Sequence, residues 1–122
     1  MAFDLVQYFS EQIKLQKPQL FDQYSSKERL YFIDEVNMLA LGQLVSLWKK
    51  DNQKLYQEIK TSDPLYIQGI ARHLTTSAYN QSALSASELE SSISEILTLQ
   101  FAELNQLDQT GSFGQTGLSE LL

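Results

Sequence analysis

Cysteine is absent from this 122-residue chain, and proline occurs only twice. Without cysteine the protein has no disulfide framework and no thiolate zinc site, which fits a reducing compartment. The length corresponds to one ordinary domain. A hydrophobic content of 43% with 11% aromatic residues is typical of a folded chain rather than a disordered one.

Basic residues are missing from the second part of the chain. All nine Lys and Arg lie within residues 1–72, whereas residues 73–122 contain six acids and no Lys or Arg, and the net charge is −6. Phosphate binding depends on Lys and Arg, so this distribution argues against nucleic-acid binding. The asymmetry has two interpretations: a surface for a basic partner, or a solvated helix face followed by a soluble tail.

No targeting signal or long hydrophobic run is evident. The first residues, MAFDLVQYFSEQ, carry an acid where a signal peptide needs positive charge. The most apolar run, residues 38–48, is eleven residues long, which is too short to span a bilayer and suits a buried helix. We therefore expect a soluble, cytoplasmic protein that does not associate with a membrane.

No segment shows the period-two alternation of a strand, and apolar residues recur at helical spacing instead. The pattern predicts an all-α, single-domain bundle of four or five helices over residues 1–108, followed by a Gly-containing C-terminal tail at 109–122. The first helix is expected over 3–16, and Pro18 either kinks it or begins a short helix over 18–24. A long helix follows from 26, which either runs to about 60 or, as we favour, breaks near Asn52 after residue 50. The last two helices are expected over 64–79 and from about 86 to 107.

Start signals support these boundaries. Ser25 with Glu28, and Ser85 with Glu88, have the spacing of a capping box, and Pro64 follows a capping Ser or Asp. Gly42 lies in the middle of the 26–50 helix, where it costs about 1 kcal/mol relative to Ala. A close crossing with another helix is the expected compensation.

Residues that could carry chemistry are few. His73 is the single histidine, and with no cysteine it cannot build a metal site, so we expect no metal and no cofactor. Asp34 and Glu35 are adjacent and diverge by about 100° on a helix, so they form no catalytic pair; Asp34 is expected at a solvated edge. The glycines at 111, 114 and 117 match no phosphate-binding motif. We expect no enzymatic activity.

Six apolar residues are the candidate partner-binding positions. Leu99 and Phe101 fall outside the apolar stripe of the last helix, which indicates either a broad buried face or a second, exposed contact surface. The tail adds four more: Phe113, Leu118, Leu121 and Leu122. Its LSELL sequence fits a short docking helix, resting on this domain, a second copy or another protein. The alternative is a frayed terminus.

The resulting hypothesis is a small, acidic, non-enzymatic helical protein that acts by protein–protein interaction as an adaptor, regulator or inhibitor. Its partner would be another protein, basic in character, and the apolar 30–48 region is also compatible with a homodimer. Two alternatives stay open. One is a nucleic-acid-associated regulator that uses the helix at 64–79; the other is an enzyme or ligand carrier with a pocket near Arg72 and His73.

Overall fold

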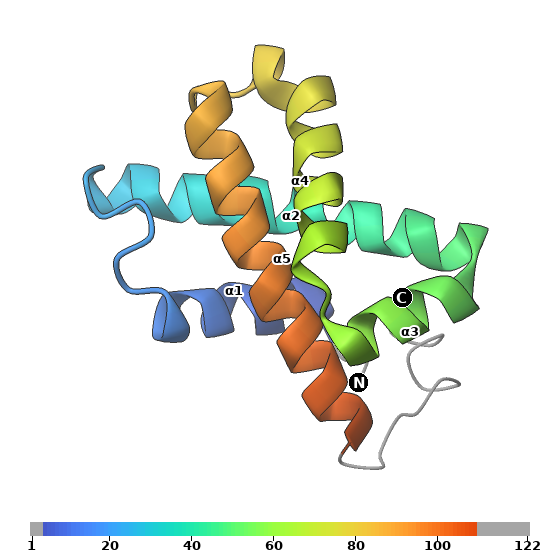
Figure 1. Ribbon diagram of the computed structural model, residues 1–122. Coiled ribbons are helices and arrows are strands. Elements are labelled where there is room, and N and C mark those ends of the chain that lie inside the picture. The colour runs from blue at the N-terminus through green and yellow to red at the C-terminus, as the bar shows by residue number, and fades with distance from the viewer. Residues whose placement is uncertain (1–3, 110–122) are drawn as a thin grey trace.

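The computed structural model describes residues 4–109, and over this range the chain forms an all-helical single domain without strands. The elements are α1 (Leu5–Gln16), α2 (Ser26–Lys50), α3 (Asn52–Thr61), α4 (Pro64–Ala78), the 3₁₀ turn η1 (Tyr79–Gln81) and α5 (Ala86–Gln109). In Figure 1, α4 and α5 pack side by side in front of α2. The predicted all-α bundle of four or five helices is confirmed. The predicted tail lies outside the described residues, apart from Gln109 at the end of α5.

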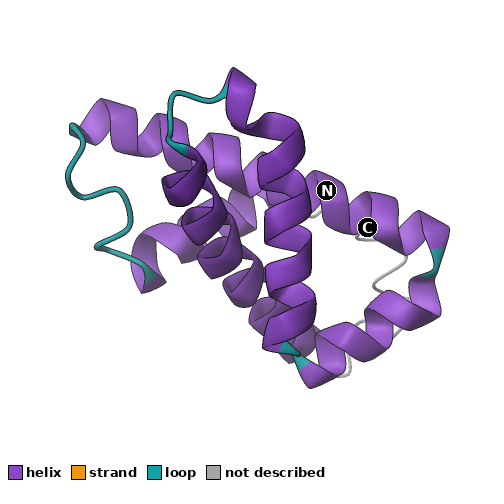
Figure 2. Ribbon diagram, turned by 45° about the horizontal axis from the view of Figure 1, so that its top comes forward, coloured by secondary structure: helices purple, strands orange, loops and turns teal. Residues whose placement is uncertain are grey.

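The helix boundaries follow the capping signals. The Ser25 hydroxyl accepts from the Glu28 amide at 3.2 Å, and the Glu28 carboxylate accepts from the Ser25 amide at 3.2 Å, which completes the predicted capping box. Asp51 ends α2 and also caps α3, where its carboxylate accepts from the Lys54 amide at 3.1 Å. The predicted break near Asn52 is therefore confirmed, and Figure 2 shows the chain turning sharply there.

The two later helices begin as expected. Asp63 accepts from the Leu65 amide at 3.0 Å, and Pro64 occupies the first turn of α4. At the start of α5 the Ser85 hydroxyl accepts from the Glu88 amide at 3.2 Å. These caps satisfy amide groups that a helix N-terminus leaves without intrahelical partners.

The predicted short helix from Pro18 is wrong, because residues 18–23 form a series of turns. Phe21 has φ of 61°, a left-handed conformation that a right-handed helix cannot contain, and its side chain is buried. The Arg29 guanidinium donates to the Leu20 carbonyl at 2.8 Å and to the Lys17 carbonyl at 3.1 Å. A side chain from α2 thus takes carbonyls that a helix would have used.

The core lies between α5 and the helices around it. Leu99 is 4% exposed and Phe101 is 0% exposed, so the expectation that either side chain forms an exposed contact surface is wrong. The alternative interpretation, a broad buried face, is what α5 has. Its flanks are covered because α2, α3, α4 and α1 all contact it.

Gly42 is not at a helix crossing within this domain, so that prediction is also wrong. A Cβ placed on Gly42 would meet nothing within 4 Å. α2 contacts α1, α3, α4 and α5, as expected of a central helix, yet it leaves one side open. Tyr31 is 65% exposed and Met38 is 61% exposed on that side.

Two buried amides join three helices. Asn37 of α2 and Gln100 of α5 are both 0% exposed. The Gln100 amide donates to the Asn37 side-chain oxygen at 2.9 Å, and the Asn37 amide donates to the Val6 carbonyl of α1 at 3.0 Å. These hydrogen bonds favour one arrangement of α1, α2 and α5, because they satisfy the buried donors of both amides, while the side-chain oxygen of Gln100 is buried without a partner.

Asn37→Ala should destabilise the protein by about 2–4 kcal/mol, because it leaves the buried Gln100 amide without its main acceptor and opens a small cavity. Urea unfolding followed by circular dichroism measures the loss. The double variant Asn37→Leu/Gln100→Leu should lose less, since it removes both polar partners together. If Asn37→Ala lowers the free energy of unfolding by less than about 1 kcal/mol, these hydrogen bonds do not hold the three helices together.

Arg29→Ala should loosen the 18–23 turns, because three carbonyls lose a charged donor. The expected cost is about 1–3 kcal/mol, with faster hydrogen exchange of amides in that segment. Arg29→Lys should restore only part of the stability, since an ammonium lacks the planar fork that reaches several carbonyls. Unchanged exchange in the Ala variant would show that the guanidinium does not hold the segment.

Candidate functional site

The acids of α5 divide into an internal group and an external group. Glu103 belongs to the first: it is 7% exposed and accepts from the Gln16 amide at 3.1 Å and from the Tyr8 hydroxyl at 3.4 Å. Burial and the nearby carboxylate raise the pKa of Tyr8. These contacts join α1 to α5, so Glu103 has a structural role.

Asp108 is the second internal acid. It forms an ion pair with Lys60 of α3 and accepts from the Tyr56 hydroxyl at 3.0 Å. The hydrogen bond from Lys60 is the main reason that the pKa of Asp108 is lowered, with Tyr56 adding to it. Burial opposes this effect, and one carboxylate oxygen is buried without a hydrogen-bond partner.

Three carboxylates remain on the first half of α5: Glu88, Glu90 and Glu95. Glu88 accepts from the Tyr24 hydroxyl at 2.5 Å and from the Ser85 hydroxyl at 3.0 Å. The Tyr24 hydrogen bond is the first cause of a lowered pKa at Glu88, and Ser85 is the second. This carboxylate is therefore held in place and stays ionised to lower pH than a free glutamate.

Open grooves flank this part of α5. One, of about 640 Å³, lies between residues 16–23 and α5. The other, of about 370 Å³, lies between α4 and α5, with Arg72 on its far wall. Ser87, Ser91 and Glu95 line both grooves and form the ridge between them.

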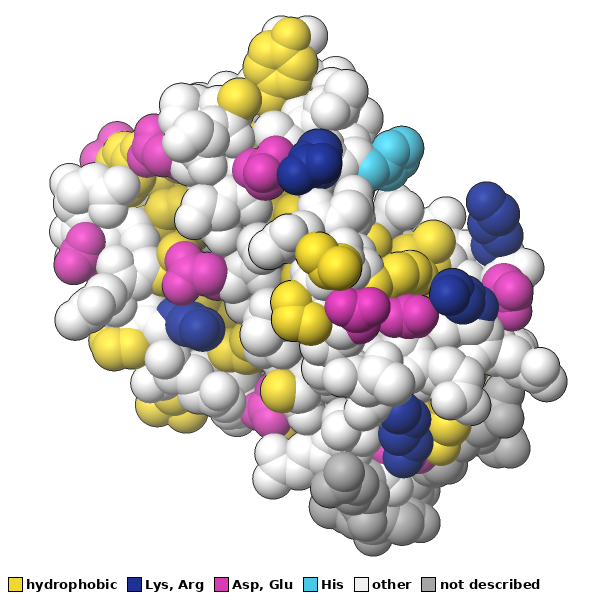
Figure 3. Space-filling view, viewed as in Figure 1, with side chains coloured by type: hydrophobic (Ala, Val, Ile, Leu, Met, Phe, Trp, Pro, Cys, Tyr) yellow, Lys and Arg dark blue, Asp and Glu magenta, His cyan; other side chains and the backbone are white. Residues whose placement is uncertain are grey.

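We call the three carboxylates and this ridge the α5 acidic surface: Ser87, Glu88, Glu90, Ser91 and Glu95. Figure 3 shows this face of the molecule, where acidic side chains lie among uncharged polar ones and several have a Lys or Arg side chain beside them. The sequence pointed to the charge of this helix. It did not reveal the ridge, although the four-residue spacing of positions 87, 91 and 95 carries that signal.

A third groove, of about 350 Å³, lies between α2 and the end of α4. Its lining is partly apolar and includes Met38, Leu39 and Ala78, together with Glu35 and Gln81. One oxygen of Glu35 is buried and has no hydrogen-bond partner. Asp34 is exposed, as predicted, and accepts from the Ser10 hydroxyl of α1 at 3.3 Å.

The residues of the nucleic-acid and pocket alternatives are dispersed. His73 is exposed on α4, and Arg72 lines the groove between α4 and α5. Thr75, one of the polar residues of this helix, is 6% exposed, and its hydroxyl donates to the Ala71 carbonyl at 2.8 Å. The polar residues of α4 therefore do not all share one outward face.

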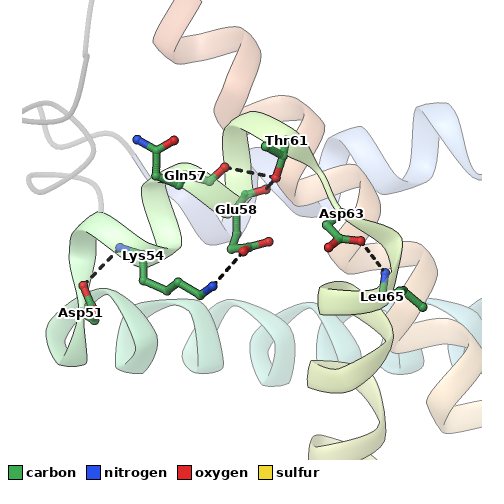
Figure 4. Close-up of polar contacts among 7 residues, drawn as sticks. All are labelled: Asp51, Lys54, Gln57, Glu58, Thr61, Asp63 and Leu65. Carbon is green, nitrogen blue, oxygen red and sulfur yellow. Dashed lines mark hydrogen bonds and ion pairs between the residues drawn. The ribbon is translucent and has the colours of Figure 1, made fainter.

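Two of the lysines before α4 are engaged within the domain. Lys54 pairs with Glu58 at 3.1 Å, as Figure 4 shows beside the caps of α3 and α4, and Lys60 pairs with Asp108. Phosphate binding by these two lysines would compete with those pairs. The candidate partner-binding residues of the tail, Phe113, Leu118, Leu121 and Leu122, lie outside the described residues.

Comparisons with family models, with curated proteins and with solved structures give no match to this chain. Within residues 4–109, no group of three His, Asp or Glu side chains could hold a metal ion. Among the described helices, α2 is long and apolar enough to cross a membrane by length and composition; the core helix of a soluble protein passes the same test.

Asp108→Asn should lower the melting temperature at pH 7, because the ion pair with Lys60 is lost. The pKa of Asp108 is lower in the folded state than in the unfolded state, where it is about 3.9. Its contribution to the free energy of unfolding is therefore fully present above the unfolded-state pKa and is lost as the pH falls through the folded-state pKa. The difference in melting temperature between variant and wild type should therefore narrow below about pH 4. Glu11→Gln, at an exposed position of α1, is the control. An equal difference at pH 7 and pH 3 would count against the ion pair as the cause.

Proposed function

We propose that this protein acts in the cytoplasm without catalysis, as an adaptor, regulator or inhibitor that binds a basic segment of another protein. One observation carries the proposal: Glu88, Glu90 and Glu95 lie on the first half of α5 and line two open grooves. Glu103 and Asp108, by contrast, are nearly buried and bonded to other helices.

The charge distribution supports a basic partner. Within residues 73–109 there are five acids and no Lys or Arg, so few cations are near enough to neutralise this face. Those that approach the grooves are Lys17 on one wall and Arg72 on another. Three carboxylates stand against these two cations, and the remaining negative charge attracts a basic partner and orients it during encounter.

The shape of the surface supports an extended segment as the ligand. Grooves on both sides of the Ser87–Ser91–Glu95 ridge give a partner two concave tracks. Long Lys or Arg side chains could place their aliphatic parts along a track and their charged ends near the carboxylates. The serines of the ridge supply hydroxyl donors and acceptors for a partner backbone.

The test compares capture of partners by the double variant Glu90→Gln/Glu95→Gln with capture by the wild type. Immobilised protein is exposed to lysate of the source cells at low and at high salt, and bound proteins are quantified by mass spectrometry. A basic partner should be retained by the wild type and reduced about tenfold in the variant, and high salt should weaken its retention. Glu88 is left unchanged because it also bonds to Tyr24 and Ser85.

The matched control is Glu11→Gln/Asp22→Asn, which changes net charge equally at exposed positions of α1 and the following turns. It should retain the partner like the wild type. Equal losses in both double variants would indicate a general charge effect. Equal retention in all three proteins would remove the α5 acidic surface from the proposal.

A further inference from the structure

One row of α2 is exposed from Asp34 to Lys50, although the Asp34 carboxylate accepts from Ser10 of α1 and Met38 lines the groove beside α4. Asp34, Met38, Gly42, Ser46 and Lys50 follow one another at four-residue spacing, and all five are exposed. Residues at this spacing form one of the ridges by which helices pack against each other. The middle of the row, around Gly42, lies on the open side of α2 with the exposed Tyr31.

The glycine at the centre of this row has no use within the described domain. A Cβ at Gly42 would meet nothing within 4 Å, so no neighbouring helix needs the missing side chain. Glycine inside an exposed helix is less favourable than alanine. A glycine does allow another backbone to approach closely, which makes the centre of the row suitable for a helix crossing.

The charges of the row are arranged symmetrically about Gly42. Asp34 lies eight residues before it and Lys50 lies eight residues after it, with Met38 and Ser46 halfway on each side. Consider two antiparallel copies of α2 related by a two-fold axis at Gly42. Asp34 of each copy then lies opposite Lys50 of the other, which gives two equivalent pairs. The same operation sets Met38 against Ser46. The row is therefore complementary to itself, as a two-fold interface requires.

We propose that two copies of this chain associate through this row of α2, with their Gly42 residues facing each other on a two-fold axis. In the commonest class of helix crossing, at about 50°, the four-residue rows of the two helices run parallel to each other. Here the rows would meet directly, and the missing side chain of Gly42 makes room for that contact. The exposed Met38 supplies apolar area at the crossing, while the Asp34 and Lys50 pairs fix the antiparallel register.

This association does not obstruct the α5 acidic surface. Gly42 is five residues from Asn37, which is about 140° around the helix, and Asn37 bonds to Gln100 of α5. Gly42, at the centre of the row, thus lies on the side of α2 away from α5, which lies in front of α2 in Figure 1. A dimer would present two α5 acidic surfaces, whatever those surfaces bind.

Sedimentation equilibrium of the full chain tests the proposal over about 1 μM to 1 mM, the range in which small interfaces associate. The wild-type mass should rise toward that of a dimer. Gly42→Leu should raise the dissociation constant at least about tenfold, because its side chain blocks the close approach. Gly69→Leu is the matched control: Gly69 is also exposed in a helix, and a Cβ added there would meet nothing within 4 Å. It should dimerise like the wild type.

Reversing the charges tests the register. Asp34→Lys and Lys50→Glu should each weaken association, and the double variant Asp34→Lys/Lys50→Glu should recover it, because the pairs are restored with opposite sign. Circular dichroism verifies folding of every variant. A wild type that remains monomeric throughout, or a Gly42→Leu variant that dimerises equally well, would overturn the proposal. Failure of the double variant to recover would overturn the register.

Discussion

The hydrogen-bonded chain from Gln100 through Asn37 to the Val6 carbonyl fixes how α5, α2 and α1 meet. Apolar contacts among these helices tolerate small shifts, since they are not directional. A buried amide tolerates few such shifts. A donor or acceptor left without a partner costs more free energy than its hydrogen bond contributes. The two amides therefore select one alignment of three helices, and the positions of the exposed surfaces follow from that alignment.

With this alignment, the two halves of α5 have different roles. The second half is enclosed, and its acids bond to Tyr8 and Gln16 of α1 and to Tyr56 and Lys60 of α3. The first half keeps its carboxylates on the surface, between the grooves. Negative charge near the start of a helix is also favoured by the helix dipole, so an outward acidic face there costs the fold little.

The 18–23 turns show how an irregular segment becomes part of a surface. Arg29 reaches back from α2 to hold the Lys17 and Leu20 carbonyls, and Tyr24 reaches across to Glu88. The segment is thereby placed as one wall of the larger groove. The contact between Tyr24 and Glu88 joins distant parts of the sequence, since the two residues are 64 positions apart.

The amino-acid pattern was enough to predict the helical class, the break at Asp51 and the starts of α2, α4 and α5. These features depend on caps and periodicity within a few residues, where backbone geometry limits the choices. It also indicated that the last helix is acidic. Three features became visible only with the packed helices: Leu99 and Phe101 are buried, residues after Pro18 turn instead of forming a helix, and Gly42 faces open space. Each of these features depends on residues that are distant in the sequence. Such residues cover a side chain, hydrogen-bond to a carbonyl, or are absent from a helix face. Helical periodicity carries no information about them.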